Sequence, residues 1–166
     1  MPHGTTQSLT ITTLESSQLP ADVNLLAGWS SAGISMSGLI DALFSMEFVS
    51  ASANRQAGVI NAYIYAALGT TPTWPDIFSA GTPGVAGAAT VRDARLLQRN
   101  LKLLQSFSFS STSAEKGSIN QEGIARLFEG LIVPSHVALF LTGTIASGTA
   151  VQLANTGNFI GYTPIT

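Results

Sequence analysis

The order of apolar and polar residues predicts strands along most of the chain. Residues 39–51 alternate in character, with Asp41, Ser45 and Glu47 on the polar face. The apolar face of this segment holds Ile40, Ala42, Phe44, Met46 and Phe48. A period of two over this length is typical of a half-buried strand, and the Phe and Val content favours a strand over a helix.

Residues 59–68 alternate more clearly than any other segment. One face holds Ile60, Ala62, Ile64 and Ala66, and the other holds Val59, Asn61, Tyr63 and Tyr65. Because both faces carry sizeable side chains, we expect a strand in the middle of a sheet, with an outer face that is covered or holds amphipathic tyrosines.

Further short segments have the same period or the composition of strands. They are residues 9–13, 105–111, 135–147, 149–155 and 158–166. In residues 135–147, Val137, Leu139 and Leu141 share one face and Ala138 and Phe140 the other. These segments are separated by turns rich in Gly, Ser and Asn, which favours strands joined by tight connections.

Helical spacing occurs at two places. Residues 91–104 either form a helix with Leu97, Leu101 and Leu104 on one side or lead into the following strand. Residues 118–130 predict a short helix, in which Ser118 and Gln121 would form a capping box. Residues 69–90 hold three prolines and four glycines and predict a long loop.

Together these segments predict an all-β fold. Many strands with one or two short helices indicate an antiparallel β-sandwich or jelly roll rather than repeated βαβ units. We expect one sandwich domain over residues 25–166, preceded by an extended N-terminal arm over residues 1–24 that ends near Pro20. Such an arm is either a flexible tail or a segment that docks on a neighbour, and docking is the favoured alternative. Deleting residues 1–19 would then leave the melting temperature nearly unchanged.

The composition favours a subunit of an assembly. Only 10% of the 166 residues are charged, against about 25% in typical soluble proteins. So few charges do little to keep molecules apart, and we expect partners over much of the surface. In the alternative, Ser, Thr, Asn and Gln solvate the surface.

Four basic residues, Arg92, Arg95, Arg99 and Lys102, would share one side of a helix. The formal net charge of −2 disfavours nucleic acid as a partner. A solvated face or an interface with an acidic partner is the interpretation that remains. The candidate protein-interface residues are Leu9 and Ile11 in the arm, Trp74 and Phe78 in the loop, and Arg92, Arg95 and Arg99. For Trp74 and Phe78 the alternative is a loop packed over the core.

No pattern of catalytic or metal-binding residues is present. The chain has no cysteine, its two histidines His3 and His136 are not in a zinc spacing, and no Gly-x-Ser-x-Gly or phosphate-binding motif occurs. We therefore expect no enzyme, metal or cofactor. No secretory signal and no run of about 18 apolar residues is present, so a membrane partner is not expected.

Four strings resemble a group of small virion proteins of tailed bacteriophages that decorate or cement the capsid. They are LLAGW at Leu25 to Trp29, INAYIYAALGTTPTWPDIF at Ile60 to Phe78, IARLFEGLIVPSHVALFLT at Ile124 to Thr142, and YTPI at Tyr162 to Ile165. The resemblance implies a jelly-roll-like sandwich that is made in the host cytoplasm and sits on the outer surface of the head, where it bridges major capsid protein subunits. It also implies self-association as a dimer or trimer about a symmetry axis.

Two other functions fit the same pattern. One is a structural protein of the tail or of the head-to-tail connector. The other belongs to a different class: a carbohydrate-binding sandwich module with Trp29, Trp74, Tyr63 or Tyr65 as stacking platforms.

Overall fold

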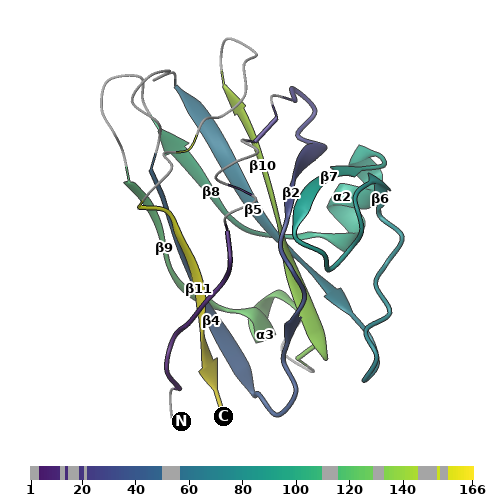
Figure 1. Ribbon diagram of the computed structural model, residues 1–166, viewed down its shortest axis with the longest axis vertical. Coiled ribbons are helices and arrows are strands. Elements are labelled where there is room, and N and C mark those ends of the chain that lie inside the picture. The colour runs from purple at the N-terminus through teal and green to yellow at the C-terminus, as the bar shows by residue number, and fades with distance from the viewer. Residues whose placement is uncertain are drawn as a thin grey trace.

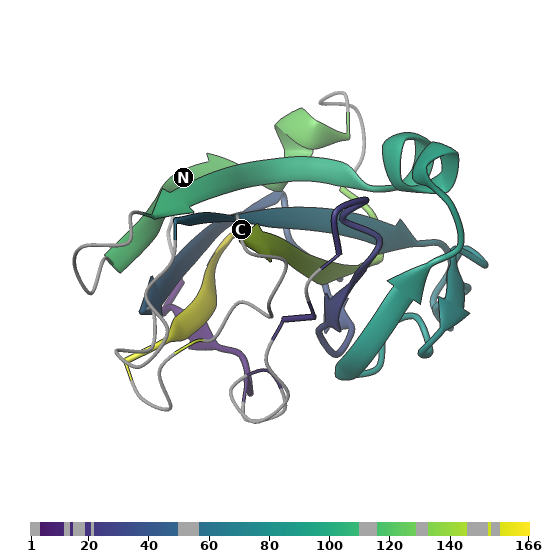
Figure 2. The same cartoon turned by 90° about the horizontal axis from the view of Figure 1, so that it is seen from above.

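The computed structural model describes residues 4–11, 14, 19–20, 22–49, 57–109, 116–128, 133–145, 153 and 157–166. Within these residues the chain forms two antiparallel sheets that pack face to face (Figures 1 and 2). The four-stranded sheet has the order β1 (Gln7–Ser8), β11 (Phe159–Ile165), β4 (Asp41–Val49) and β9 (Lys116–Gly123). The seven-stranded sheet has the order β6 (Phe78–Ala80), β7 (Gly87–Val91), β2 (Ala27–Ser30), β10 (His136–Ile145), β5 (Gly58–Ala67) and β8 (Lys102–Phe109), with β3 (Ile34–Ser35) also paired to β10. The two helices of the described residues are α2 (Ala94–Asn100) and α3 (Ile124–Leu127).

Eight of these strands follow the order of a jelly roll. When β1, β2, β4, β5, β8, β9, β10 and β11 are counted in chain order from 1 to 8, the sheets read 1-8-3-6 and 2-7-4-5. This is the arrangement of two Greek keys wrapped into a double sheet. The prediction of an all-β antiparallel sandwich is confirmed.

The main core lies between the two sheets and follows the predicted alternation. Strand β4 buries every second residue, and its buried residues are Ala42, Phe44, Met46 and Phe48. Strand β10 turns Val137, Leu139 and Leu141 into the same core. Ile40 departs from the prediction because it precedes β4, where the alternation has not begun, and is 57% exposed.

The described residues of the N-terminal segment belong to the sandwich, which corrects the expected arm over residues 1–24. Gln7 and Ser8 pair with Tyr162 and Gly161 of β11, so β1 is the edge strand of the four-stranded sheet. The core between the sheets also includes Ile11, Leu14 and Leu19. Because apolar side chains gain free energy when they leave water, these residues hold the segment on its own domain.

Residues 69–101 form an insertion between β5 and β8, which corrects the predicted loop at 69–90. Its two strands β6 and β7 extend the seven-stranded sheet beyond β2, and α2 follows directly (Figure 1). The segment 91–104 therefore holds both of the predicted alternatives, a helix and then the start of β8.

The insertion covers the outer face of the seven-stranded sheet with a second hydrophobic cluster. This cluster is Tyr65, Ile77, Phe78, Ala89, Val91, Leu97, Leu101, Ala138 and Phe140. Strand β5 lies between β10 and β8, and the outer side chain of Tyr65 is fully buried. The prediction of a central strand with a covered outer face is confirmed.

The helix predicted at 118–130 begins later than expected, and its capping box is wrong. Ser118 and Gln121 lie in β9, and the helix starts at Ile124 after Gly123. The carboxylate of Asp41 replaces the expected cap, since its Oδ1 accepts a hydrogen bond of 2.9 Å from the amide of Ala125. A Cβ atom at residue 123 would lie 2.2 Å from Asp41 Oδ2, so only glycine leaves room for this long-range cap. The end of the predicted helix, residues 129–130, and most of the predicted strand 149–155 lie outside the described residues.

Candidate functional site

The described residues gather no cluster of three His, Asp or Glu side chains that would bind a metal ion. His136 begins β10, is half-buried, and its Nδ1 lies 3.3 Å from Ser135 Oγ. Among the described helices none is long and apolar enough to cross a membrane. The insertion carries most of the predicted interface residues.

A buried hydroxyl group joins the insertion to the jelly roll. Tyr65 Oη in β5 accepts a hydrogen bond of 2.8 Å from the amide of Gly84 and lies 2.8 Å from Ser30 Oγ in β2. Ser30 Oγ donates its own proton to the carbonyl of Ser31. In the hydrogen bond between the two hydroxyl groups, Tyr65 is therefore the donor and Ser30 Oγ is the acceptor. Burial raises the pKa of Tyr65, so the phenol stays protonated and keeps donating this bond.

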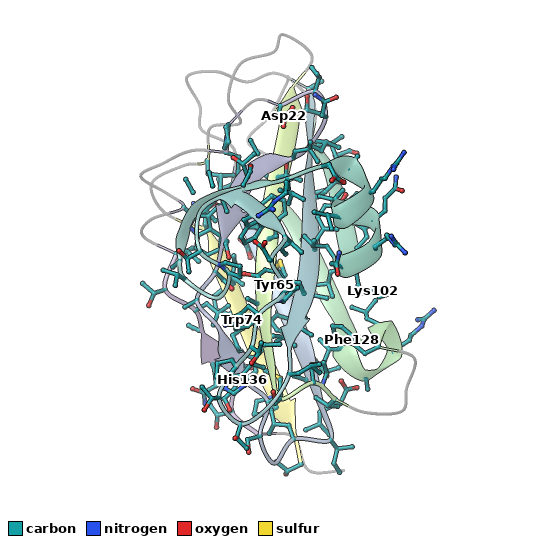
Figure 3. The ribbon with its side chains drawn as sticks, turned by 90° about the vertical axis from the view of Figure 1, so that its right-hand side faces the viewer. Asp22, Tyr65, Trp74, Lys102, Phe128 and His136 are labelled. Carbon is teal, nitrogen blue, oxygen red and sulfur yellow. The ribbon has the colours of Figure 1, made fainter. Side chains whose placement is uncertain are left out.

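The indole of Trp74 packs on the same junction. It forms an edge contact with the ring of Tyr65, with 5.4 Å between the ring centroids. A Cβ atom on Gly84 would lie 2.4 Å from the indole, and one on Gly33 would lie 2.7 Å from it. The amide of Gly33 also donates a hydrogen bond of 2.9 Å to the carbonyl of Gly84. The two glycines thus let the backbone approach the ring closely, and the insertion is fixed to the sandwich (Figure 3).

The outer side of α2 is basic. The helix is capped by Asp93, whose Oδ1 accepts from the amides of Arg95 and Leu96 at 2.8 and 2.9 Å. Leu97 faces the second hydrophobic cluster, while Arg95 and Arg99 are exposed. Neither guanidinium forms an ion pair within the described part of the chain, where the one salt bridge joins Arg92 to Asp76 at 2.8 Å. Because both members of that pair are largely exposed, the pair contributes little to stability.

One further basic side chain lies near this surface in β8. Lys102 follows α2 after Leu101, and Figure 3 shows it on the same side of the molecule as the helix. Leu103 comes next in the strand, so its side chain points to the opposite face of the sheet, and it is 48% exposed. It is paired in register with the half-buried Tyr63 of β5. Sequence reasoning did not identify Leu103, because an apolar residue in a strand is expected in the core.

The structure divides the seven predicted interface residues. Arg92, Arg95 and Arg99 are exposed, as a contact surface requires. Ile11 and Phe78 are buried in the two hydrophobic clusters and are withdrawn as interface candidates. Leu9 and Trp74 are half-buried and pack against those clusters, so for Trp74 the alternative of a loop packed over the core is the one observed.

Burial also removes half of the aromatic residues considered for carbohydrate stacking. Trp29 and Tyr65 are 1% and 0% exposed, so neither offers a ring face to a sugar. Trp74 uses its indole against Gly33 and Gly84. Tyr63 is also half-buried, but no glycine of the described residues is packed against its ring. It is the candidate of the four that remains.

The chain matches no protein-family model and no curated protein sequence.

Proposed function

We propose that the protein is a virion structural protein of a tailed bacteriophage, a decoration or cement protein that binds the outer surface of the head and stabilises the lattice of the major capsid protein. The observation that carries the proposal is the jelly-roll strand order in a chain with only 10% charged residues. Jelly rolls recur in capsid proteins, although lectins and cupins share the architecture. The four strings that resemble small phage virion proteins support the same function.

The mechanism of such a protein is adhesion. A protein that binds the mature shell but not its separate subunits stabilises the shell by its binding free energy at every occupied site. The affinity of each single contact can be low when a dimer or trimer engages several subunits at once, because the second contact then forms at high effective concentration. A rigid double sheet with a firmly attached insertion suits this work, since little conformational entropy is lost when it binds.

Cryo-electron microscopy of the parent virion tests the proposal. Copies of this chain spread over the outer head in a fixed ratio to the capsid subunits are the expected result. Copies confined to the tail or to the head-to-tail connector would instead assign the protein to those structures. A complementary assay adds purified protein to heads that lack it, where saturation at lattice stoichiometry is expected and bare tails serve as the control.

A further inference from the structure

We propose that Arg95, Arg99 and Lys102 form a basic face through which the protein recognises an acidic surface on a protein partner. The inference rests on the proposed function, under which the partner is the major capsid protein. It adds which residues make the contact. Arg95 and Arg99 lie on the insertion, and Lys102 is the first residue of the jelly-roll strand β8 that follows it.

The distribution of charge along the chain is the first argument. Residues 92–102 contain four of the seven basic residues and one of the nine acidic residues, which gives this segment a net charge of +3. The rest of the chain then carries −5. A local positive field on an otherwise negative molecule orients the protein toward a local acidic surface and raises the association rate.

The same asymmetry decides between the possible polyanions. Nucleic acid and anionic lipid present a negative surface over a wide area, which the remaining −5 would repel. A protein partner presents acidic groups over a limited area and matches a limited basic face. Protein interfaces are also enriched in Arg.

The folded chain gains little from these cations, since only Arg99 lies in the last turn of α2, where the helix dipole favours a basic residue. Arg95 and Arg99 are four residues apart on one side of α2, and like charges at this spacing destabilise a helix slightly. Arg95 is in the first turn, where the helix dipole favours an acidic residue. Both side chains remain without an ion pair to any described residue. Their charge is therefore available to a partner.

The insertion holds the basic face in a fixed position. Leu97 and Leu101 bury the inner side of α2 in the second hydrophobic cluster. The hydrogen bond from Gly84 to Tyr65 and the packing of Trp74 attach the preceding part of the insertion to β5. Because little flexibility remains to be lost, even a few charge contacts are useful for binding.

A binding assay on purified heads that lack this chain tests the inference. Sedimentation measures the dissociation constant of the wild-type protein and of Arg95→Ala/Arg99→Ala between low and high salt. We expect the variant to bind about 10-fold more weakly at low salt and to lose much of its salt dependence. Alanine is the best helix former, so the variant is expected to stay folded, and Arg95→Gln/Arg99→Gln provides a second variant that keeps side-chain length.

Two controls separate the basic face from general effects. Thr5→Glu/Ser37→Glu changes the net charge by the same amount at exposed positions outside the insertion. Gln98→Ala shortens an exposed, uncharged side chain in α2 itself. Both controls are expected to bind within about twofold of the wild type, as surface substitutions away from a contact usually do.

Each other outcome is decisive. Wild-type binding that the arginine variants and the charge control lose equally would show that net charge matters and the basic face does not. Equal binding by the wild type and the arginine variants would overturn the basic face and leave the decoration function standing. Wild-type protein that does not bind heads at all would overturn the decoration function, and this inference with it.

Discussion

The hydroxyl group of Tyr65 accepts a hydrogen bond of 2.8 Å from the backbone amide of Gly84, nineteen residues further along the chain. Tyr65 belongs to β5 of the jelly roll. Gly84 belongs to the insertion, in the segment that joins β6 to β7. The same hydroxyl group lies 2.8 Å from Ser30 Oγ in β2. One buried oxygen atom thus joins two strands of the sandwich to the segment that carries the basic face.

Removing this oxygen is expected to destabilise the fold. Tyr65→Phe would leave the amide of Gly84 and the hydroxyl of Ser30 short of a partner, at a cost of about 1–3 kcal/mol in the free energy of unfolding. Urea denaturation measures the change. Tyr63→Phe is the matched control, because the Tyr63 hydroxyl makes no hydrogen bond to the described residues, and its effect should stay within about 0.5 kcal/mol. Equal effects of the two substitutions would contradict the role of the Tyr65 hydroxyl.

Gly84 should tolerate a methyl group less well than another glycine with the same backbone conformation. Gly84 has φ +73°, and a Cβ atom there would lie 2.4 Å from the indole of Trp74. Gly38 has φ +77° with nothing within 4 Å of its Cβ position. Gly38→Ala should therefore lower the free energy of unfolding only through the strain of alanine in a left-handed backbone conformation, about 1–2 kcal/mol. Gly84→Ala adds overpacking against the ring, about 1–3 kcal/mol more.

Thermal or urea unfolding of both glycine variants measures that difference. Trp74→Ala should reduce the extra cost of Gly84→Ala in a double-mutant cycle, because the ring that meets the methyl group is then gone. Similar losses for Gly84→Ala and Gly38→Ala would mean that the indole can move aside.

The sequence predicted those elements whose residues alternate strictly. Strands β4, β5 and β10 were identified because a central strand of a sandwich must turn every second side chain to the core. The covered outer face of β5 was also predicted, since Tyr63 and Tyr65 are too large to leave that face to water. The strand order remained hidden, because it depends on pairings between residues far apart in the chain.

The elements that sequence reasoning missed depend on long-range contacts. Strand β7 has the sequence GAATV, whose small residues give no strong period. It forms because β2 offers an edge, and Ala89 and Val91 then enter the second cluster. The capping box failed for a similar reason, because the cap of α3 comes from Asp41, more than eighty residues earlier.

The candidate surface was predicted in part. The stripe of basic residues required only the helical period, and α2 displays Arg95 and Arg99 as expected. Ile11 was predicted as a contact residue because the Ser/Thr-rich N-terminal segment carries few core-sized residues, and for Phe78 a loop packed over the core was the alternative to a contact; both side chains are buried. Their burial became visible only with the fold, which brings the N-terminal segment and the insertion onto the two sheets.

Leu14 should be as important for stability as a central core residue. Its side chain is fully buried between the sheets, so Leu14→Ala is expected to cost about 2–5 kcal/mol. Deleting residues 1–19 would remove β1, Ile11, Leu14 and Leu19 together and should prevent stable folding, contrary to the expectation for a free arm. Circular dichroism with thermal melting measures both changes. Leu68→Ala is the control, because Leu68 is 76% exposed, and a loss as large as that of Leu14→Ala would contradict the packing.

Asp22 is expected to make the stability of the fold depend on pH in the acid range. Its Oδ1 accepts a hydrogen bond from the amide of Asn24, and its Oδ2 accepts bonds from Leu26 and Ala27, at 2.8 to 2.9 Å. Burial of the carboxyl raises its pKa, but the backbone hydrogen bonds outweigh this effect, and the pKa in the folded state lies below its ordinary value. The carboxylate therefore stabilises the fold above the pKa of the unfolded chain, about 4. This stabilisation is lost as the pH falls through the lower pKa of the folded state.

Comparison with Asp22→Asn isolates this contribution from those of the other acidic residues. The asparagine cannot ionise, so the wild type should be more stable than the variant at pH 7, and the difference should shrink toward pH 2 to 3, roughly the range below the ordinary Asp pKa. Urea unfolding of both proteins at several pH values measures it. A difference that stays constant across this range would show that the three amides bind the neutral side chain equally well, and that the charge of Asp22 does not hold the turn before β2.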